Sequence, residues 1–304
     1  MTLTQQQAAP PSLSYELYPP ARPEAEAAVL RAIEELGATN PDYVSVTYSG
    51  TPVRRRASVR LVEHLVRNTR LRPLAHLTCV GETRDSLDLL VRQLVGLGVR
   101  GVLAMRGDLP ADPEAFRGEL PFARYLVELI RQVEAGHSAT LAGGRLSVGV
   151  AAYPNRHPES PSFQHDVEVL VSKERSGANF AITQVYFDPA HYARLVAAAR
   201  AAGVTIPIIP GVIPMSSVRR LERLAVMTGV RPDGALLHRL ETASGEAERR
   251  RIGVRAAAGL ARAAFDAGAP GLHLYTFNDP RASIEVIDQV GLPATRTLSS
   301  PVPA

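Results

Sequence analysis

Hydrophobic residues along this chain alternate between two spacings, one typical of buried strands and the other of amphipathic helices. The pattern is clearest over residues 74–108, where a β-prone run, a helical segment and a second apolar run, residues 101–105, follow one another. Thr83 or Asp85 is expected to cap the helix. The apolar positions at helical spacing are Leu87, Leu90, Val91, Leu94 and Val95. Two strands joined by one helix are predicted to be parallel, because a hairpin needs no such crossover.

The same alternation continues through most of the chain and predicts eight strands, each followed by helix. The strands are expected over residues 13–18, 43–48, 74–80, 101–105, 146–152, 180–186, 206–212 and 271–276. This order predicts an α/β protein with a single (β/α)8 TIM barrel as its catalytic domain, over residues 13–290. Residues 1–12 and 291–304 are expected to be disordered tails. A doubly wound open sheet is the alternative, but the turn after the first strand, residues 18–22, has no glycine-rich fingerprint.

Composition narrows the function classes. The 304 residues are 45% hydrophobic and 21% charged, with a formal net charge of +4, which is ordinary for a soluble globular protein. No basic stripe with interleaved aromatics occurs, so no nucleic-acid partner is expected. No run reaches the ~18 apolar residues of a membrane span, so no membrane partner is expected. The lone cysteine, Cys79, excludes a disulfide framework, and with no signal pattern at the N-terminus we expect a cytoplasmic protein.

Polar residues stand at or near the ends of most predicted strands, where a barrel of this class places its active site. Core packing would not select such a set. Its members are Glu16, Thr47, His76, Thr78, Arg106, Asp108, Tyr153, Gln184 and Asn278.

Two carboxylates in this set suggest chemistry. Glu16 lies inside a predicted strand, and if it points into the barrel, desolvation raises its pKa and makes it a proton donor. The alternative is an outward side chain paired with an arginine of a covering helix. Asp108 follows Arg106-Gly107, and an ion pair with that arginine or a contact with a cofactor are both open.

Two other kinds of site are weaker candidates. His157, Glu159, His165 and Asp166 match no metal-ligand spacing, so no metal is expected. A barrel lyase or aldolase would need a Schiff-base lysine, but the only lysine, Lys173, falls in a predicted helix rather than on a strand.

Several motifs, in this order and spacing, resemble the methylenetetrahydrofolate reductase family over residues 13–290. They are YELYPP at 15–20, VSVTY at 44–48, HLT at 76–78, LAMRGD at 103–108, AAYP at 151–154, HPE at 157–159, AITQ at 181–184, IPGVIP at 209–214 and HLYTFN at 273–278.

The resemblance implies a flavoprotein that reduces 5,10-methylenetetrahydrofolate to 5-methyltetrahydrofolate and feeds methionine synthesis. NADH or NADPH would pass hydride to FAD, and folate would receive it, in a ping-pong sequence. By the same resemblance, Glu16 is the general acid, Asp108 tunes the flavin and favours a cationic intermediate, and Gln184 and Tyr275 bind the folate. The implied FAD contacts are Thr47, Tyr48, His76, Arg106, Gly107, Asp108, Ala123, Tyr153, His157, Asp166 and Lys173.

The chain departs from the family pattern in a few places. The loop at residues 49–53 replaces a glycine-rich turn, and Val169 and Ser172 stand where some members have polar or basic FAD contacts. Asp279 stands where a basic residue is usual, with Arg281 as the nearby substitute. Leu224 stands where some members have a phenylalanine.

Some alternatives stay open within the resemblance. One is a flavin-free or only folate-binding member of the family. The sequence also leaves open the choice between NADH and NADPH, because no Rossmann acidic residue is present to indicate it. A homo-oligomer is compatible with the sequence, which carries no signal of subunit number.

Overall fold

The computed structural model describes residues 10–48, 51–110, 112, 114–137, 141 and 144–292 of the protein. In this part of the chain one parallel sheet runs in the order β7-β6-β5-β4-β3-β2-β1-β9-β8. Its strands are β1 (Ser12–Leu17), β2 (Tyr43–Val46), β3 (Pro73–Thr78), β4 (Gly101–Met105), β5 (Ser147–Ala152), β6 (Phe180–Thr183), β7 (Ile208–Ile209), β8 (Gly211–Val212) and β9 (Gly271–Tyr275). The two strands at the ends of this order are consecutive in the chain, so the sheet closes into a barrel.

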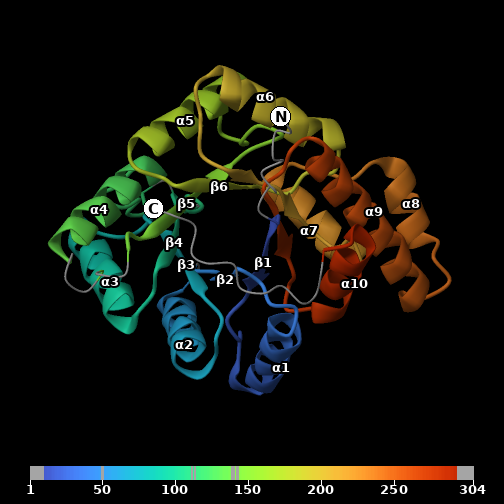
Figure 1. The fold of residues 1–304 in the computed structure, drawn as a ribbon, viewed down its shortest axis with the longest axis horizontal. Coiled ribbons are helices and arrows are strands. Elements are labelled where there is room, and N and C mark those ends of the chain that lie inside the picture. Colours follow the sequence, from blue (N-terminus) through green and yellow to red (C-terminus); the bar gives the residue numbers. More distant parts are fainter. Residues whose placement is uncertain are drawn as a thin grey trace, which may run out of the picture.

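Helices surround the strands on the outside, as Figure 1 shows. They are α1 (Glu26–Gly37), α2 (Pro52–Asn68), α3 (Arg84–Leu97), α4 (Ala123–Gly136), α5 (Phe163–Arg175), α6 (Pro189–Ala201), α7 (Val218–Thr228), α8 (Gly234–Glu241), α9 (Glu246–Asp266) and α10 (Pro280–Val290), with a 3-10 turn, η1 (Pro23–Ala25), before the first. The predicted (β/α)8 barrel is therefore confirmed. None of the described helices combines the length and apolarity that crossing a membrane would take.

The seventh barrel strand is divided at Pro210, where the sequence predicts one strand over residues 206–212. Proline has no N–H to donate to a sheet. Its carbonyl still accepts a hydrogen bond from the His273 backbone, at 3.0 Å, and the next backbone N–H, from Gly211, turns to the Thr183 hydroxyl at 2.9 Å. The short strands β7 and β8 thus pair with different neighbours, β6 and β9, and join them.

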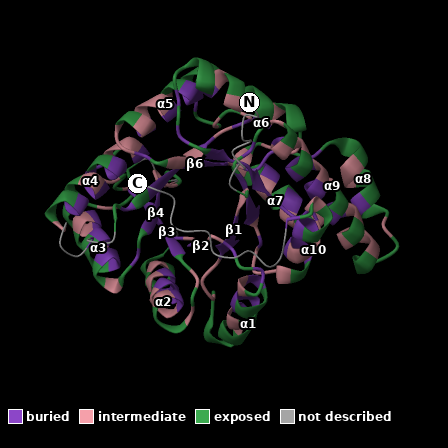
Figure 2. Ribbon diagram, in the orientation of Figure 1, coloured by how far each residue is buried: buried purple, intermediate pink, exposed green. Residues whose placement is uncertain are grey.

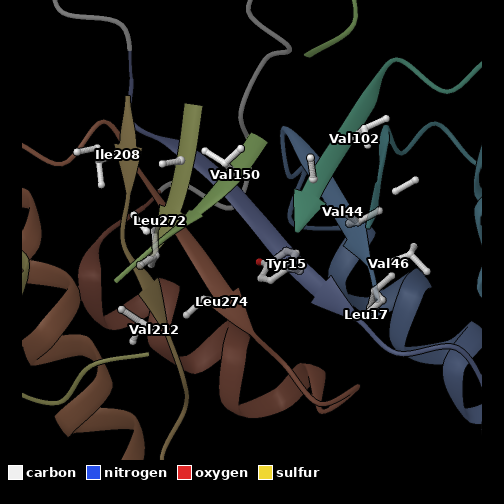
Figure 3. Close-up of a cluster of buried hydrophobic side chains, with 14 of the residues drawn as sticks. Tyr15, Leu17, Val44, Val46, Val102, Val150, Ile208, Val212, Leu272 and Leu274 are labelled. Carbon is white, nitrogen blue, oxygen red and sulfur yellow. The ribbon is translucent and has the colours of Figure 1, made fainter. Parts of the chain in front are cut away.

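The two faces of the strands have different roles. Outward residues such as Tyr15 and Leu17 pack in the main hydrophobic cluster between strands and helices (Figure 3). Figure 2 shows the same contrast, with buried residues on the strands and on the inner sides of the helices. A second, smaller cluster fills part of the barrel interior and contains Leu74, Leu103, Ile182 and Ile209. Because side chains alternate along a strand, Ser14 and Glu16 face this interior while Tyr15 faces the helices.

Most predicted elements are present, with shifted ends. Thr83, rather than Asp85, caps α3: its hydroxyl accepts a hydrogen bond from the Ser86 backbone at 3.1 Å. Ser12, assigned from the sequence to the disordered tail, is the first residue of β1. At the other end, Gly291 is the C-cap of α10 and Leu292 is buried, so the predicted C-terminal tail begins two residues too early. Residues 1–9 and 293–304 of the predicted tails lie outside the described residues. β6 ends at Thr183 instead of residue 186, which leaves Gln184 in the loop that follows.

Candidate active site

Glu16 points into the barrel near the carboxyl end of β1, and only 6% of it is exposed. Its carboxylate lies 3.9 Å from Nε2 of His76 and is hydrogen-bonded by the Tyr18 hydroxyl. Burial raises the pKa of Glu16 to about 7, and the Tyr18 hydrogen bond opposes this. Burial also lowers the pKa of His76 to about 3, so the imidazole is neutral. The structure therefore excludes the alternative of an outward Glu16 paired with a helix arginine, and gives a carboxyl that can carry a proton near neutral pH.

Residues that follow β9 form hydrogen bonds with the backbone of Glu16 and Tyr18. The Thr276 hydroxyl donates to the Glu16 carbonyl at 2.6 Å, and the side-chain amide of Asn278 bonds both the N–H and the C=O of Tyr18, each at 2.9 Å. The Tyr18 ring stacks on Phe277 with 5.4 Å between centroids. The first and last motifs of the chain thus form one side of the barrel mouth.

Arg106 and Asp108 follow β4 and have separate roles. The Arg106 guanidinium makes two hydrogen bonds with the Glu159 carboxylate, at 2.6 and 2.8 Å. The predicted alternative of an Arg106–Asp108 ion pair is therefore wrong, because Glu159 takes that place. Asp108 is exposed at the rim, and its charge adds to the effects that raise the pKa of Tyr153 to about 12, of which burial is the largest.

Gly107 allows the turn between these two residues. Its φ of +89° is in the left-handed region that favours glycine. A Cβ at this position would lie 3.0 Å from the Cβ of Thr78. The rim therefore needs a glycine here, with its backbone close against the end of β3.

The residues after β5 form a connected cluster with Arg106. The His157 and Tyr153 rings are perpendicular, with 4.7 Å between their centroids, and the His157 backbone N–H donates to the Asp166 carboxylate at 2.9 Å. Lys173 reaches from α5 under this group, donates to the Ala151 carbonyl at 2.8 Å and lies 5.6 Å from the Tyr153 ring centroid. Burial lowers the pKa of Lys173 to about 8. Five of the residues expected to contact FAD are therefore together.

The two residues expected to bind folate stand on either side of β8. The Tyr275 hydroxyl donates to the Thr183 carbonyl at 2.7 Å, above Gly211. Gln184 follows β6, where its backbone donates to Ala152 at 2.8 Å. Its side-chain oxygen accepts from the Val185 backbone at 2.8 Å, so its NH₂ group remains available as a donor.

The other expected FAD contacts lie at neighbouring element ends. Thr47 follows β2, and its carbonyl accepts from the Ser58 hydroxyl at 2.6 Å. The adjacent Tyr48 ring lies 5.6 Å from the Arg55 guanidinium. Ala123 is buried at the first position of α4. The altered loop is described only from Thr51, which caps α2.

The residues present suit a flavin dinucleotide. Lys173 is a buried cation with two N–H donors beyond its bond to Ala151, Gly107 leaves the backbone open at the rim, and Nε2 of His76 is buried without a hydrogen-bond partner. By contrast, no group of three or more His, Cys, Asp or Glu side chains in the described ranges could hold a metal ion. A cavity of about 390 Å³ between α8 and α9 is lined by none of the expected site residues.

Three residues of the mouth were not among the predicted site residues. Tyr18 and Glu159 belong to quoted motifs, and that position was the only signal for them. Arg220, in the first turn of α7, had none. Its guanidinium is 4.0 Å from the Asp279 carboxylate and 5.3 Å from the Phe277 ring centroid. A cation is thus present beside Asp279, contributed by Arg220 from a different helix.

Comparisons with known proteins show which sequences and folds this chain is similar to. A family model described as methylenetetrahydrofolate reductase matches residues 2–291. The 5,10-methylenetetrahydrofolate reductases of Salmonella typhimurium and Escherichia coli are each 32% identical over 282 residues, 92% of this chain and 91% of those proteins. Among solved structures, an uncharacterized Clostridium thermocellum protein, described as binding two copies of 5-methyl-5,6,7,8-tetrahydrofolic acid, is similar with a TM-score of 0.66. It is 15% identical, with 94% of this chain and 95% of that chain covered, and shows likeness of fold.

Proposed function

Because the chain belongs to the methylenetetrahydrofolate reductase family, whose members are oxidoreductases, we propose that it reduces 5,10-methylenetetrahydrofolate to 5-methyltetrahydrofolate, using FAD and a reduced nicotinamide. The observation that carries this proposal is Glu16, buried inside the barrel mouth with a pKa of about 7. A carboxyl with this pKa suits general acid catalysis near neutral pH.

Glu16 has the proton that folate reduction requires. Opening the imidazolidine ring of the substrate leaves a ring nitrogen that must be protonated, and Glu16 donates that proton. The Tyr18 hydroxyl holds the carboxyl in place by a hydrogen bond, and the neutral His76 ring lies 3.9 Å from it. Asp108 supplies a negative charge that favours the cationic substrate formed on ring opening. The free NH₂ of Gln184 is available to bond the pterin.

FAD, when bound, supplies the hydride-transfer chemistry. The residues that would hold it are the cluster after β4 and β5 and the rim of β2 and β3. Lys173 would provide a cation, Gly107 would allow close approach of the backbone, and the Tyr153 and His157 rings would provide packing surface. Glu159 fixes Arg106 in this arrangement.

We expect the folate half-reaction to slow as pH rises through about 7. Glu16 must be protonated to act, and its pKa is raised to about 7, so the active fraction falls tenfold for each further pH unit. The check is a pH profile of single-turnover folate reduction, with nicotinamide oxidation measured in the same buffers. If the rates of both half-reactions fell at the same pH, the assignment to Glu16 would be contradicted.

Asp108→Asn is expected to raise the flavin reduction potential and slow folate reduction. A negative charge near the flavin disfavours the added electrons and favours a cationic substrate, so removing it reverses both effects. Spectroelectrochemical titration measures the first and stopped-flow absorbance the second. An exposed control, Asp112→Asn, should change neither.

An absorbance spectrum of the purified protein, followed by anaerobic titration with NADH and with NADPH, tests the proposal as a whole. We expect a flavin spectrum that one nicotinamide bleaches and that methylenetetrahydrofolate restores. A colourless protein that takes up no added FAD would instead support the alternative of a flavin-free or folate-binding member of the family.

A further inference from the structure

Arg124, the second residue of α4, is a half-buried cation at the junction of α4 and α5. Its Nη1 donates to the Ser172 hydroxyl at 3.3 Å and its Nη2 to the Tyr125 hydroxyl at 2.6 Å. The guanidinium lies 4.6 Å from the Tyr125 ring centroid, and its Nε is buried without any hydrogen-bond partner. The Nε is too buried to meet a ligand, but each Nη has a second N–H beyond these bonds, so the guanidinium can still donate to an anion at this junction.

Two other arginines near the mouth have a carboxylate partner, whereas Arg124 has none among the described residues. Arg55 pairs with Glu82 and Arg106 with Glu159. No salt bridge with a carboxylate is recorded for Arg124 within the described ranges. It stands, moreover, in the first turn of a helix, where the macrodipole disfavours a cation. The residue before α4, Phe122, provides no side-chain cap for the N–H groups of the first turn, although its carbonyl accepts from the Tyr125 N–H at 3.0 Å. Positive charge is therefore uncompensated at this place.

Arg124 and Ser172, which contact each other, are each adjacent in the chain to a residue that is expected to bind FAD. Ala123 precedes Arg124 in α4, and Lys173 follows Ser172 in α5. Lys173 is the buried cation of the Tyr153 cluster. Ser172 is also a position at which the sequence departs from the family pattern. The unpaired guanidinium thus lies beside the residues that would hold the flavin, and not on a remote surface.

We propose that Arg124, held in place by Ser172 and Tyr125, binds the diphosphate of FAD. A planar guanidinium matches the paired oxygens of a phosphate, and a phosphate would offset both the cation and the uncapped start of α4. This assignment rests on the proposed use of FAD. The other source of the same chemistry is the diphosphate of the nicotinamide dinucleotide.

The test is flavin affinity of the apoprotein, measured by fluorescence quenching with FAD, FMN and riboflavin. Arg124→Ser should weaken FAD about tenfold to a hundredfold, as for loss of a hydrogen bond to a charged group. Riboflavin, which has no phosphate, should bind unchanged. Arg124→Lys keeps the charge without the fork and should lie between. Arg175→Ser, which removes an exposed arginine from α5, is the matched control and should bind FAD as the wild type does.

A charge exchange makes the test independent of packing losses. The double variant Arg124→Ser/Ser172→Arg returns a guanidinium to the same place from the other helix and should regain most of the lost FAD affinity. Equal FAD affinity in Arg124→Ser and wild type, or equal weakening of riboflavin, would overturn the assignment. Weaker nicotinamide binding with unchanged FAD would overturn it in favour of the nicotinamide diphosphate. A wild-type protein that binds no FAD would instead refute the proposed cofactor, and the assignment with it.

Discussion

Replacing Glu16 by glutamine is expected to lower the rate of folate reduction by about two to four orders of magnitude, the usual contribution of a general acid. The amide has nearly the shape of the carboxyl but no acidic proton. Nicotinamide oxidation needs no proton from this residue and should continue near the wild-type rate. Stopped-flow absorbance at the flavin band measures each half-reaction separately.

A buried carboxyl outside the mouth provides the control for this variant. Glu134 in α4 is 8% exposed and bonds Arg131 and the Leu146 backbone. Glu134→Gln should reduce stability and leave the ratio of the two half-reactions unchanged. If Glu16→Gln slowed both half-reactions equally, the residue would have a structural role and not that of a general acid.

Gly211→Ala is expected to destabilise the fold by about 1–3 kcal/mol, the range for overpacking a buried site. An added Cβ would lie 2.4 Å from the Thr183 carbonyl oxygen and 2.6 Å from the Tyr275 ring, so backbone or ring must move. The hydrogen bond between Tyr275 and Thr183, which spans the closing seam of the barrel, would be lost or displaced. Urea denaturation measures the stability.

The control for Gly211 is a glycine with free space. Gly259 lies inside α9, and a Cβ there would meet nothing within 4 Å. Gly259→Ala should be neutral or stabilise the protein by up to about 1 kcal/mol, because alanine favours the helix. If both variants behaved alike, steric closure at Gly211 would not be the cause. The Gly211 variant should also weaken folate binding through Tyr275, and the Gly259 variant should not.

Much of this architecture was predictable, because the spacing of apolar residues is a local property. The repeated strand-helix pattern predicted the barrel and placed Glu16 inside its first strand, but it left open whether this side chain points inward or outward. Once a parallel barrel is assumed, strand ends share one mouth, so the pattern also predicted which residues meet there. The pattern predicted one strand over residues 206–212 but not its division between two neighbours at Pro210.

Partners far apart in the chain were decided only by the tertiary structure. The sequence suggested Asp108 as a partner for Arg106, but in the closed barrel Arg106 pairs with Glu159, 53 residues away. Tyr18 and Asn278 are 260 residues apart, and Arg124 and Ser172 are 48 apart. No periodicity specifies such pairs, because they depend on how adjacent loops meet around a ring.

The sequence by itself thus determined the barrel, the strand ends that share its mouth and the family resemblance. The structure decided the state of the site. The pKa of Glu16 depends on how completely water is excluded from it and on Tyr18. Glu159 pairs with Arg106 while Asp108 is exposed, and the Arg124 guanidinium bonds Ser172 and Tyr125 but no carboxylate among the described residues. Desolvation and partner choice arise only when the chain closes, since both are properties of three-dimensional surroundings and not of neighbouring residues.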